Sequence, residues 1–205
     1  MARVTAEVRE ATRARLLTAA AEEFAQAGFE RASVDAISLA AGYAKGTIYN
    51  YFPSKEELFL AVVEEALAQA AATTGPPPPS ASAWERLAAV LADFCGWASQ
   101  HDPLARVLVR ECLMGTPGLY PRVIGAEWPL TGELEAIIAD GIANGELRGD
   151  VSAGLLALAI AGLTDLALVK HWATGGTSSS LAEIPALVLT LLVGHPAGGQ
   201  QRPFW

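Results

Sequence analysis

The stretch that most constrains this chain is residues 33–60, which read SVDAISLAAGYAKGTIYNYFPSKEELFL. Ser33 can cap a first short helix, because its hydroxyl can accept a hydrogen bond from a free N–H of the first turn. Gly42 then gives the backbone the freedom for a tight turn. We predict a second short helix over 44–52. The Ser-x-x-Glu pattern at 54–57 is a capping box that begins a longer helix.

Two short helices joined by a glycine turn form a helix-turn-helix, whose second helix enters the DNA major groove. Lysines suit phosphate, hydroxyls donate to phosphate, and a glycine lets the backbone approach closely. Asn can pair with adenine, and apolar surface can touch a thymine methyl. We expect the ring of Tyr49 to lie in the core beside Phe52, with its hydroxyl at phosphate. The predicted DNA contacts are Ser33, Tyr43, Ala44, Lys45, Gly46, Thr47, Tyr49, Asn50 and Lys55, of which Tyr43, Ala44 and Asn50 face the groove.

This stretch resembles the DNA-binding signature of the tetracycline-repressor (TetR) family of bacterial regulators. The resemblance implies a homodimer with a constant DNA-reading domain, a variable effector domain, and repression as the default. The chain departs from the family pattern at Leu39, at Tyr43 and at Ala44, where a polar, a small aliphatic and a capping residue are usual. The matching residues are Val34, Ile37, Ala41, Gly42, Lys45, Gly46, Thr47, Tyr49, Phe52 and the run 54–59.

Apolar residues recur at helical spacing along the rest of the chain, and no segment alternates as a strand would. We therefore predict an all-α fold of about nine helices. The expected organisation is a three-helix DNA-binding domain at 1–54, a connecting helix at 55–74, a proline-rich linker at 75–82, a helical ligand-binding and dimerisation domain at 83–194, and a flexible tail at 195–205.

The net charge of −8 is unevenly distributed along the 205 residues. Residues 1–55 hold seven basic and six acidic side chains, which gives +1, and residues 56–205 carry the remaining −9. Nucleic-acid binding depends on the charge that faces phosphate and not on the total. The acidity therefore belongs to the second part of the chain and does not exclude a DNA-binding first part.

The segment 151–169 is apolar almost all round, and a membrane span is the first alternative for it. Thr164 and Asp165 interrupt the apolar run, so we favour a buried bundle helix and no membrane partner. Two such apolar helices would leave a large exposed patch on a monomer. We expect a homodimer in which the last two helices pair with their copies, through Gly154, Ala157, Ala161, Leu187 and Leu191.

A helical bundle with a few polar groups among bulky apolar ones can hold a ligand. We expect a lipophilic or aromatic effector, although each candidate residue could instead be plain core. Glu111 and Asp165 lie on apolar faces, where an unpaired carboxylate is costly. They either pair with Arg106, Arg110 or Lys170, or meet a ligand amine or hydroxyl. The candidate pocket residues are Phe94, Trp97, Leu108, Glu111, Cys112, Trp128, Ile138, Asp165 and Trp172.

The sequence gives little support to an enzyme. It contains no phosphate loop, no nucleophile elbow and no zinc-protease motif, and its three histidines lie at no metal-ligand spacing. We therefore expect no cofactor and no metal. The two cysteines, Cys95 and Cys112, suggest reduced thiols, with a redox switch as the less favoured alternative, and the absence of a leader suggests the cytoplasm. The alternatives are a ligand-binding helical scaffold without sequence-specific DNA binding and, less favoured, an all-α enzyme.

Overall fold

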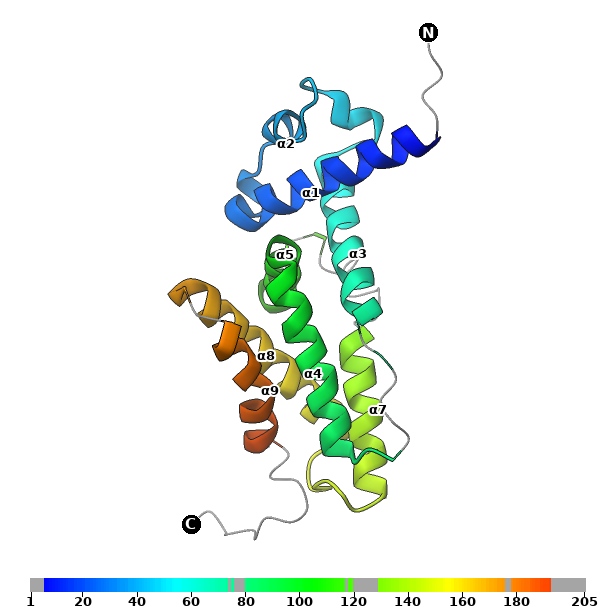
Figure 1. Ribbon diagram of the computed structural model, residues 1–205, viewed down its shortest axis with the longest axis vertical. Helices are drawn as coiled ribbons and strands as arrows, with labels where there is room; N and C mark the ends of the chain where they lie inside the picture. The colour runs from blue at the N-terminus through cyan, green and yellow to red at the C-terminus, as the bar shows by residue number, and fades with distance from the viewer. Residues whose placement is uncertain are drawn as a thin grey trace. The chain divides into compact units, whose positions relative to one another are not determined.

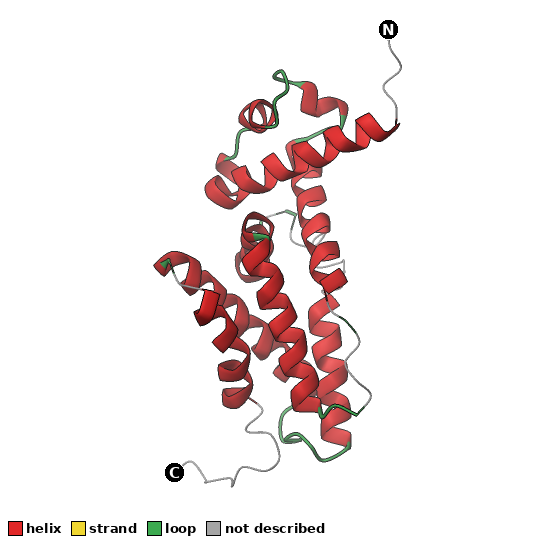
Figure 2. Cartoon of the chain, viewed as in Figure 1, coloured by secondary structure: helices red, strands yellow, loops and turns green. Residues whose placement is uncertain are grey.

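The computed structural model describes residues 6–73, 75, 80–116, 118–119, 129–175 and 178–192. Within these ranges the chain forms eight α-helices and one short 3-10 helix, without strands (Figure 2). The all-α prediction is therefore confirmed. The prolines of the predicted linker, Trp128 and the predicted tail lie outside the described residues.

The chain divides into two compact units, Met1–Ala68 with His101–Gly125 and Gln69–Gln100 with Ala126–Trp205. This division groups the helix that begins at Asp102 with the N-terminal helices. The domain boundaries at 54 and at 75–82 stay predictions. The first unit holds α1 (Ala6–Arg31), α2 (Val34–Ala40), the 3-10 helix η1 (Thr47–Asn50), most of α3 (Lys55–Thr73) and α5 (Asp102–Met114). The second holds α4 (Ala83–Gln100), α7 (Pro129–Ala143), α8 (Ala153–Thr174) and α9 (Ser178–Leu192).

In the first unit, aromatic packing holds the end of α1 against α3. The ring of Phe59 meets those of Phe24 and Phe29 edge-on, at centroid distances of 5.0 and 5.1 Å. The backbone leaves helical geometry at Gly28, where φ is +73° and ψ is 168°, and one more turn follows to Arg31. Gly28 is thus a kink in α1, at a conformation that favours glycine.

In the second unit, α4, α7, α8 and α9 pack in a ring, each helix against two neighbours (Figure 1). At Gly141 of α7 a Cβ atom would lie 2.6 Å from Cβ of Ala83 on α4, so only glycine fits this crossing. The bundle core is formed by fully buried aliphatic side chains from all four helices: Leu87, Leu91, Leu134, Ile138, Ile160, Leu168 and Leu189.

By length and composition, α8 is the one described helix that could cross a membrane, and 39% of its most apolar window is buried inside the chain. Its buried side includes Ile160, Thr164 and Leu168. Because α8 packs against both α7 and α9, we interpret it as a bundle helix.

Candidate DNA-reading unit and effector site

The first helix of the predicted helix-turn-helix forms as the sequence indicates. The Ser33 hydroxyl accepts a hydrogen bond from the N–H of Ala36 at 3.2 Å and caps α2. Gly42 adopts φ +83° in the turn that follows. The buried Ser38 hydroxyl donates to the carbonyl oxygen of Ala44 at 2.9 Å. The N-cap and the glycine turn are confirmed, and the Ser38 hydrogen bond is an additional, unpredicted link across the turn.

The second helix differs from the prediction. We call residues 44–52 the reading segment. Only Thr47–Asn50 is helical there, as a single 3-10 turn, so the prediction of a helix over 44–52 is wrong in length and type. Gly46 precedes the turn at φ +80° and ψ −10°, in the left-handed region, which interrupts a regular helix. No side chain caps the turn.

Two apolar side chains fix the reading segment to the core. Ile48 and Phe52 are buried, as predicted for Phe52. The Tyr49 side chain is 52% exposed, so the expectation of a buried ring is wrong. A short 3-10 turn carries consecutive side chains to different sides, and with Ile48 inside, Tyr49 lies outside. Of the other predicted contacts, Ala44, Lys45 and Asn50 are exposed, while Gly46 and Thr47 are half-buried.

The Tyr43 side chain makes two contacts with α1. Its hydroxyl donates to Oγ1 of Thr12 on α1 at 3.3 Å, and the Arg15 guanidinium lies 5.3 Å from its ring centroid. The polar tip of this half-buried side chain is therefore bonded within the unit, and its groove-facing role stays a prediction.

The two lysines have different surroundings. Lys45 Nζ lies 3.4 Å from Oδ2 of Asp35, and both side chains are exposed, so this pair contributes little stability and leaves the ammonium accessible. Lys55 Nζ donates to the carbonyl oxygen of Glu30 at 2.9 Å and lies 4.9 Å from the ring centroid of Phe29. Lys55 thus satisfies a carbonyl at the end of α1, and Lys45 is the better placed of the two for phosphate.

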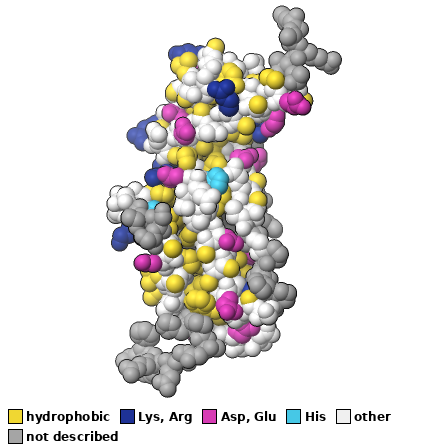
Figure 3. Space-filling view, viewed as in Figure 1, with side chains coloured by type: hydrophobic (Ala, Val, Ile, Leu, Met, Phe, Trp, Pro, Cys, Tyr) yellow, Lys and Arg dark blue, Asp and Glu magenta, His cyan; other side chains and the backbone are white. Residues whose placement is uncertain are grey.

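The arginines of α1 were not among the predicted DNA contacts. Arg9 donates to the carbonyl oxygen of Asn50 at 3.4 Å, and its guanidinium lies 5.2 Å from the ring centroid of Tyr51. Arg13, one turn along, lies 5.5 Å from the ring centroid of Phe52. Their i, i+4 spacing was the available signal, since it places both on one face. Figure 3 shows Lys and Arg side chains on the surface of this end of the chain.

The predicted effector residues fall into two groups. Leu108, Glu111 and Cys112 belong to α5 of the first unit. The others belong to the second unit: Phe94 and Trp97 on α4, Ile138 on α7, and Asp165 and Trp172 on α8, with Trp128 outside the described residues.

Glu111 is buried but satisfied locally. Its carboxylate accepts hydrogen bonds from the backbone N–H and the hydroxyl of Thr116, at 2.7 and 2.8 Å. Arg106 bonds Asp102 instead, and Arg110 donates to backbone carbonyl oxygens of α1. Of the two alternatives for Glu111, pairing with an arginine is therefore not the one that forms, and its partner is Thr116. Because the Glu111 carboxylate already accepts these two hydrogen bonds, it is less able to bind a ligand.

Asp165 is the other acid, and it is 5% exposed. In the described part of the chain the structure records no hydrogen bond or ion pair for it, so the alternative in which it pairs with Lys170 does not form. Burial raises the pKa of Asp165 to about 7. Burial, and secondarily the charge of Asp165, raises the pKa of the Cys95 thiol to about 12. On the same helix as Cys95, the rings of Phe94 and Trp97 stack with centroids 5.8 Å apart.

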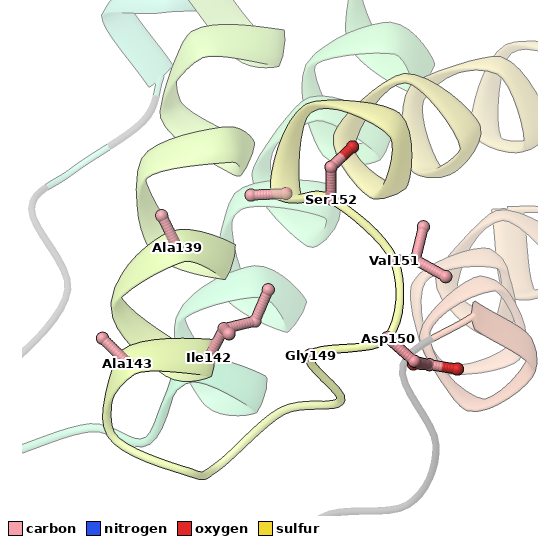
Figure 4. A pocket seen from close by; sticks show the side chains of 8 residues that line it. Ala139, Ile142, Ala143, Gly149, Asp150, Val151 and Ser152 are labelled. Carbon is pink, nitrogen blue, oxygen red and sulfur yellow. The ribbon is translucent and has the colours of Figure 1, made fainter.

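A shallow cavity of about 430 Å³ lies where α7 ends and α8 begins (Figure 4). It contains none of the predicted effector residues. Its carboxylate, Asp150, bonds the neighbouring Arg148 at 2.6 Å. The lining consists of Ala139, Ile142, Ala143, Gly149, Asp150, Val151, Ser152 and Ala153.

The predicted dimerisation residues fall into two groups, one buried inside the second unit and one exposed on its surface. Ala157 and Ala161 are buried inside the second unit, and a Cβ on Gly154 would lie 3.0 Å from Oε1 of Glu135 on α7. These small residues face the chain's own bundle, so their assignment to a surface between copies is corrected. Leu187 and Leu191 of α9 are 60% and 65% exposed, as a dimer surface requires. Further exposed apolar side chains lie on α8, at Leu155, Leu158, Leu163, Leu166 and Val169.

A helix-turn-helix unit together with an apolar-cored helical bundle is typical of DNA-binding transcriptional regulators. The family model for bacterial regulatory proteins of the tetR family matches residues 16–62, and that for the tetracyclin repressor-like C-terminal domain matches residues 80–188. The chain belongs to the TetR family of transcriptional regulators. Because members of this family are DNA-binding transcription factors and not enzymes, the expectation of a non-enzyme is confirmed.

Known relatives resemble the chain over most of its length. The fatty acid metabolism regulator protein of Bacillus subtilis is 27% identical over 179 residues, which cover 87% of this chain and 92% of that protein. The transcriptional repressor AcnR of Corynebacterium diphtheriae is 27% identical over 177 residues, covering 86% and 88%. Among solved structures, the regulator FadR of Bacillus subtilis in complex with stearoyl-CoA has a TM-score of 0.76 at 24% identity, covering 89% and 98%.

Proposed function

We propose that this TetR-family regulator is a cytoplasmic homodimer that binds a palindromic operator as a repressor and is released by a small lipophilic effector. The exposed leucines of α8 and α9 carry the proposal. Leu155, Leu158, Leu166, Leu187 and Leu191 are all more than half exposed. A monomer would leave this apolar surface in water, which is unfavourable.

A dimer made through these helices fits the DNA-reading unit. Burying a leucine side chain contributes roughly 1.5–3 kcal/mol, so the five side chains together can support a stable dimer. A two-fold axis would relate the two reading segments, and a palindromic operator with half-sites one helical turn or multiples apart has the same symmetry. Lys45, Thr47, Tyr49 and Asn50 are the proposed contacts to this DNA, with Ala44 beside them.

The dimer proposal is tested by placing a charge on the leucine surface. Leu158→Glu and Leu187→Glu should each shift the chain from dimer to monomer in light scattering at micromolar concentration. Ala136→Glu adds the same charge at an exposed position of α7 and should leave the dimer intact. A wild-type chain that is monomeric at all concentrations would overturn the proposal, as would dimers that survive both leucine substitutions.

For the effector, we propose a molecule with a long acyl chain. The second unit offers bulky apolar side chains at Phe94, Trp97 and Ile138. The related fatty acid metabolism regulator and the solved complex with stearoyl-CoA indicate this ligand class. Asp165 is the proposed polar group of the site, since it lies buried in the same unit without a recorded partner among the described residues.

The effector proposal is tested by thermal unfolding and by release from DNA. A ligand that binds only the folded state raises the unfolding temperature as its concentration exceeds its Kd. Stearoyl-CoA should therefore raise the unfolding temperature and release bound DNA, whereas coenzyme A alone should do neither. If neither stearoyl-CoA nor free stearate changes either quantity, the acyl-chain proposal is wrong, while operator binding is unaffected by that result.

A further inference from the structure

Thr12 and Arg15 of α1 form a small cluster with Tyr43, which lies in the turn after α2. The ring of Tyr43 lies beneath the Arg15 guanidinium, at 5.3 Å from centroid to carbon. Its hydroxyl donates to Oγ1 of Thr12 at 3.3 Å, and the Thr12 hydroxyl donates to the carbonyl oxygen of Val8 at 2.8 Å. A tyrosine that replaces the family's small aliphatic residue is thus bonded at its tip and covered on its face.

The cluster also includes the turn itself. Nη2 of Arg15 lies 3.1 Å from the position that a Cβ atom on Gly42 would occupy. Gly42 therefore meets two demands at once, a φ of +83° and a close approach of the guanidinium. The backbone N–H of Tyr43 donates to the carbonyl oxygen of Ser38 at 2.9 Å, which fixes the start of the turn.

The reading segment needs such support because it has little regular structure. Its one 3-10 turn contains four residues and lacks a side-chain cap. Isolated turn-type backbone hydrogen bonds, such as that from the N–H of Tyr49 to the carbonyl oxygen of Gly46 at 3.2 Å, hold it in place of a continuous helical ladder. At its far end, Arg9 and Arg13 pack on Tyr51 and Phe52. Side-chain contacts from α1 hold both ends of the segment, and Arg15 with Tyr43 is the contact at the end where DNA reading begins.

We propose that Arg15 and Tyr43 are a positioning pair that orients the reading segment on DNA, and that Arg15 acts through the tyrosine ring and not through phosphate. The proposal rests on operator binding as proposed above. Arginine suits the role because its planar guanidinium stacks on aromatic faces. Removing either partner should loosen the segment, which must then be ordered at the moment of binding, and affinity should fall for that reason.

A double-mutant cycle on operator binding tests this coupling. Arg15→Met and Tyr43→Leu should each weaken binding by roughly 2- to 5-fold, the range of an exposed cation–π contact. The double variant should be no weaker than the weaker single variant, because both changes remove one interaction. Tyr43→Phe keeps the ring and should retain more of the affinity. Arg31→Met removes one charge from the same helix without an aromatic contact and is the matched control.

Two further readouts separate positioning from other roles. If Arg15 contacts phosphate, the slope of log affinity against log salt falls by about 1 in Arg15→Met and the two single effects add. Positioning predicts an unchanged slope and a changed base preference in selection from random DNA. As a control for folding, the thermal unfolding midpoint of each variant should lie near the midpoint of Arg31→Met. The positioning proposal is wrong if the losses of affinity in the two single variants add in the double variant. It is also wrong if the variants bind with wild-type affinity and unaltered base preference. If the wild-type chain itself selects no palindrome, the proposed operator function has failed instead.

Discussion

The Arg110 guanidinium occupies the space beside Gly28, with Nη1 2.9 Å from the position that a Cβ atom would take. The same group donates to the carbonyl oxygens of Phe24 and Ala25, at 3.3 and 3.2 Å. These carbonyls end the regular part of α1, where intrahelical partners run out. Arg110 of α5 therefore satisfies the end of α1, and Gly28 allows it to approach.

Arg110→Met should lower the free energy of unfolding by about 1–3 kcal/mol, because two charge-assisted hydrogen bonds are lost and two half-buried carbonyls lose a donor. Arg106→Met in the same helix removes a half-exposed i, i+4 pair with Asp102 and should cost less, about 0.5 kcal/mol. Urea unfolding of both variants measures the difference. Equal effects in the two variants would show that the Arg110 bonds contribute nothing beyond surface charge.

Gly141→Ala should destabilise the chain by about 1–3 kcal/mol, since the new methyl would lie 2.6 Å from Cβ of Ala83 and 2.7 Å from Cδ1 of Leu147. Gly132→Ala, on the same helix, has no neighbouring atom within 4 Å and should stabilise it by about 0.5–1 kcal/mol through helix propensity. Thermal unfolding of the pair checks this. A stabilised Gly141→Ala variant would mean that α4 and α7 are not packed as described.

Asp165 should make the stability of the chain depend on pH. Burial raises its pKa from 3.8 to about 7, so between these values the folded chain holds a proton that the unfolded chain releases. Stability from this group is present at low pH and is lost as pH rises toward 7. Relative to wild type, Asp165→Asn should therefore gain on the order of 2 kcal/mol in unfolding free energy between pH 5 and pH 8.

The control for this pH effect is Asp165→Leu, which also removes the titrating group but packs differently. Urea unfolding at pH 5 and pH 8 should give both variants the same pH trend relative to wild type, whatever their absolute stabilities. A constant difference from wild type across this range would show that the Asp165 carboxyl titrates as an exposed acid does.

The two cysteines should react with maleimide at different rates. The buried Cys95 has a pKa of about 12 and holds almost no thiolate at pH 8, whereas Cys112 is half-buried. Mass spectrometry of the folded chain should find Cys112 modified about 10-fold faster or more. In denaturant the two rates should converge. Faster labelling of Cys95 in the folded chain would contradict its burial in the second unit.

The elements of the DNA-reading unit that depend on local chemistry could be predicted from the sequence. The Ser33 cap, the Gly42 turn and the burial of Phe52 each follow from one residue and its neighbours. The extent of the second helix could not, because Gly46 adopts a left-handed conformation that its type permits but does not require. Arg9 and Arg15 were missed because their partners lie in another part of the sequence.

In the second unit, the apolar pattern predicted where helices form but not which side of each helix is buried. The α8 sequence is apolar all round, so periodicity does not separate Ala157, which is buried, from Leu158, which is exposed. Small residues suggested a contact between copies, yet Ala157 and Ala161 are buried inside the chain's own unit and Gly154 lies against Glu135 of α7. The partner of Glu111 was unpredictable for a similar reason, since Thr116 lies beyond the end of α5, in a turn whose course the sequence does not specify.

The most direct test of the account is selection of bound sequences from a random DNA pool by the purified full-length chain, at two salt concentrations. We predict enrichment of one palindrome whose half-sites are one helical turn or multiples apart, and loss of that enrichment in Lys45→Ala and Tyr49→Ala. Ala136→Glu should select the same palindrome as the wild type. Failure of a folded dimer to enrich any palindrome at either salt concentration would contradict the central claim of a dimeric operator reader.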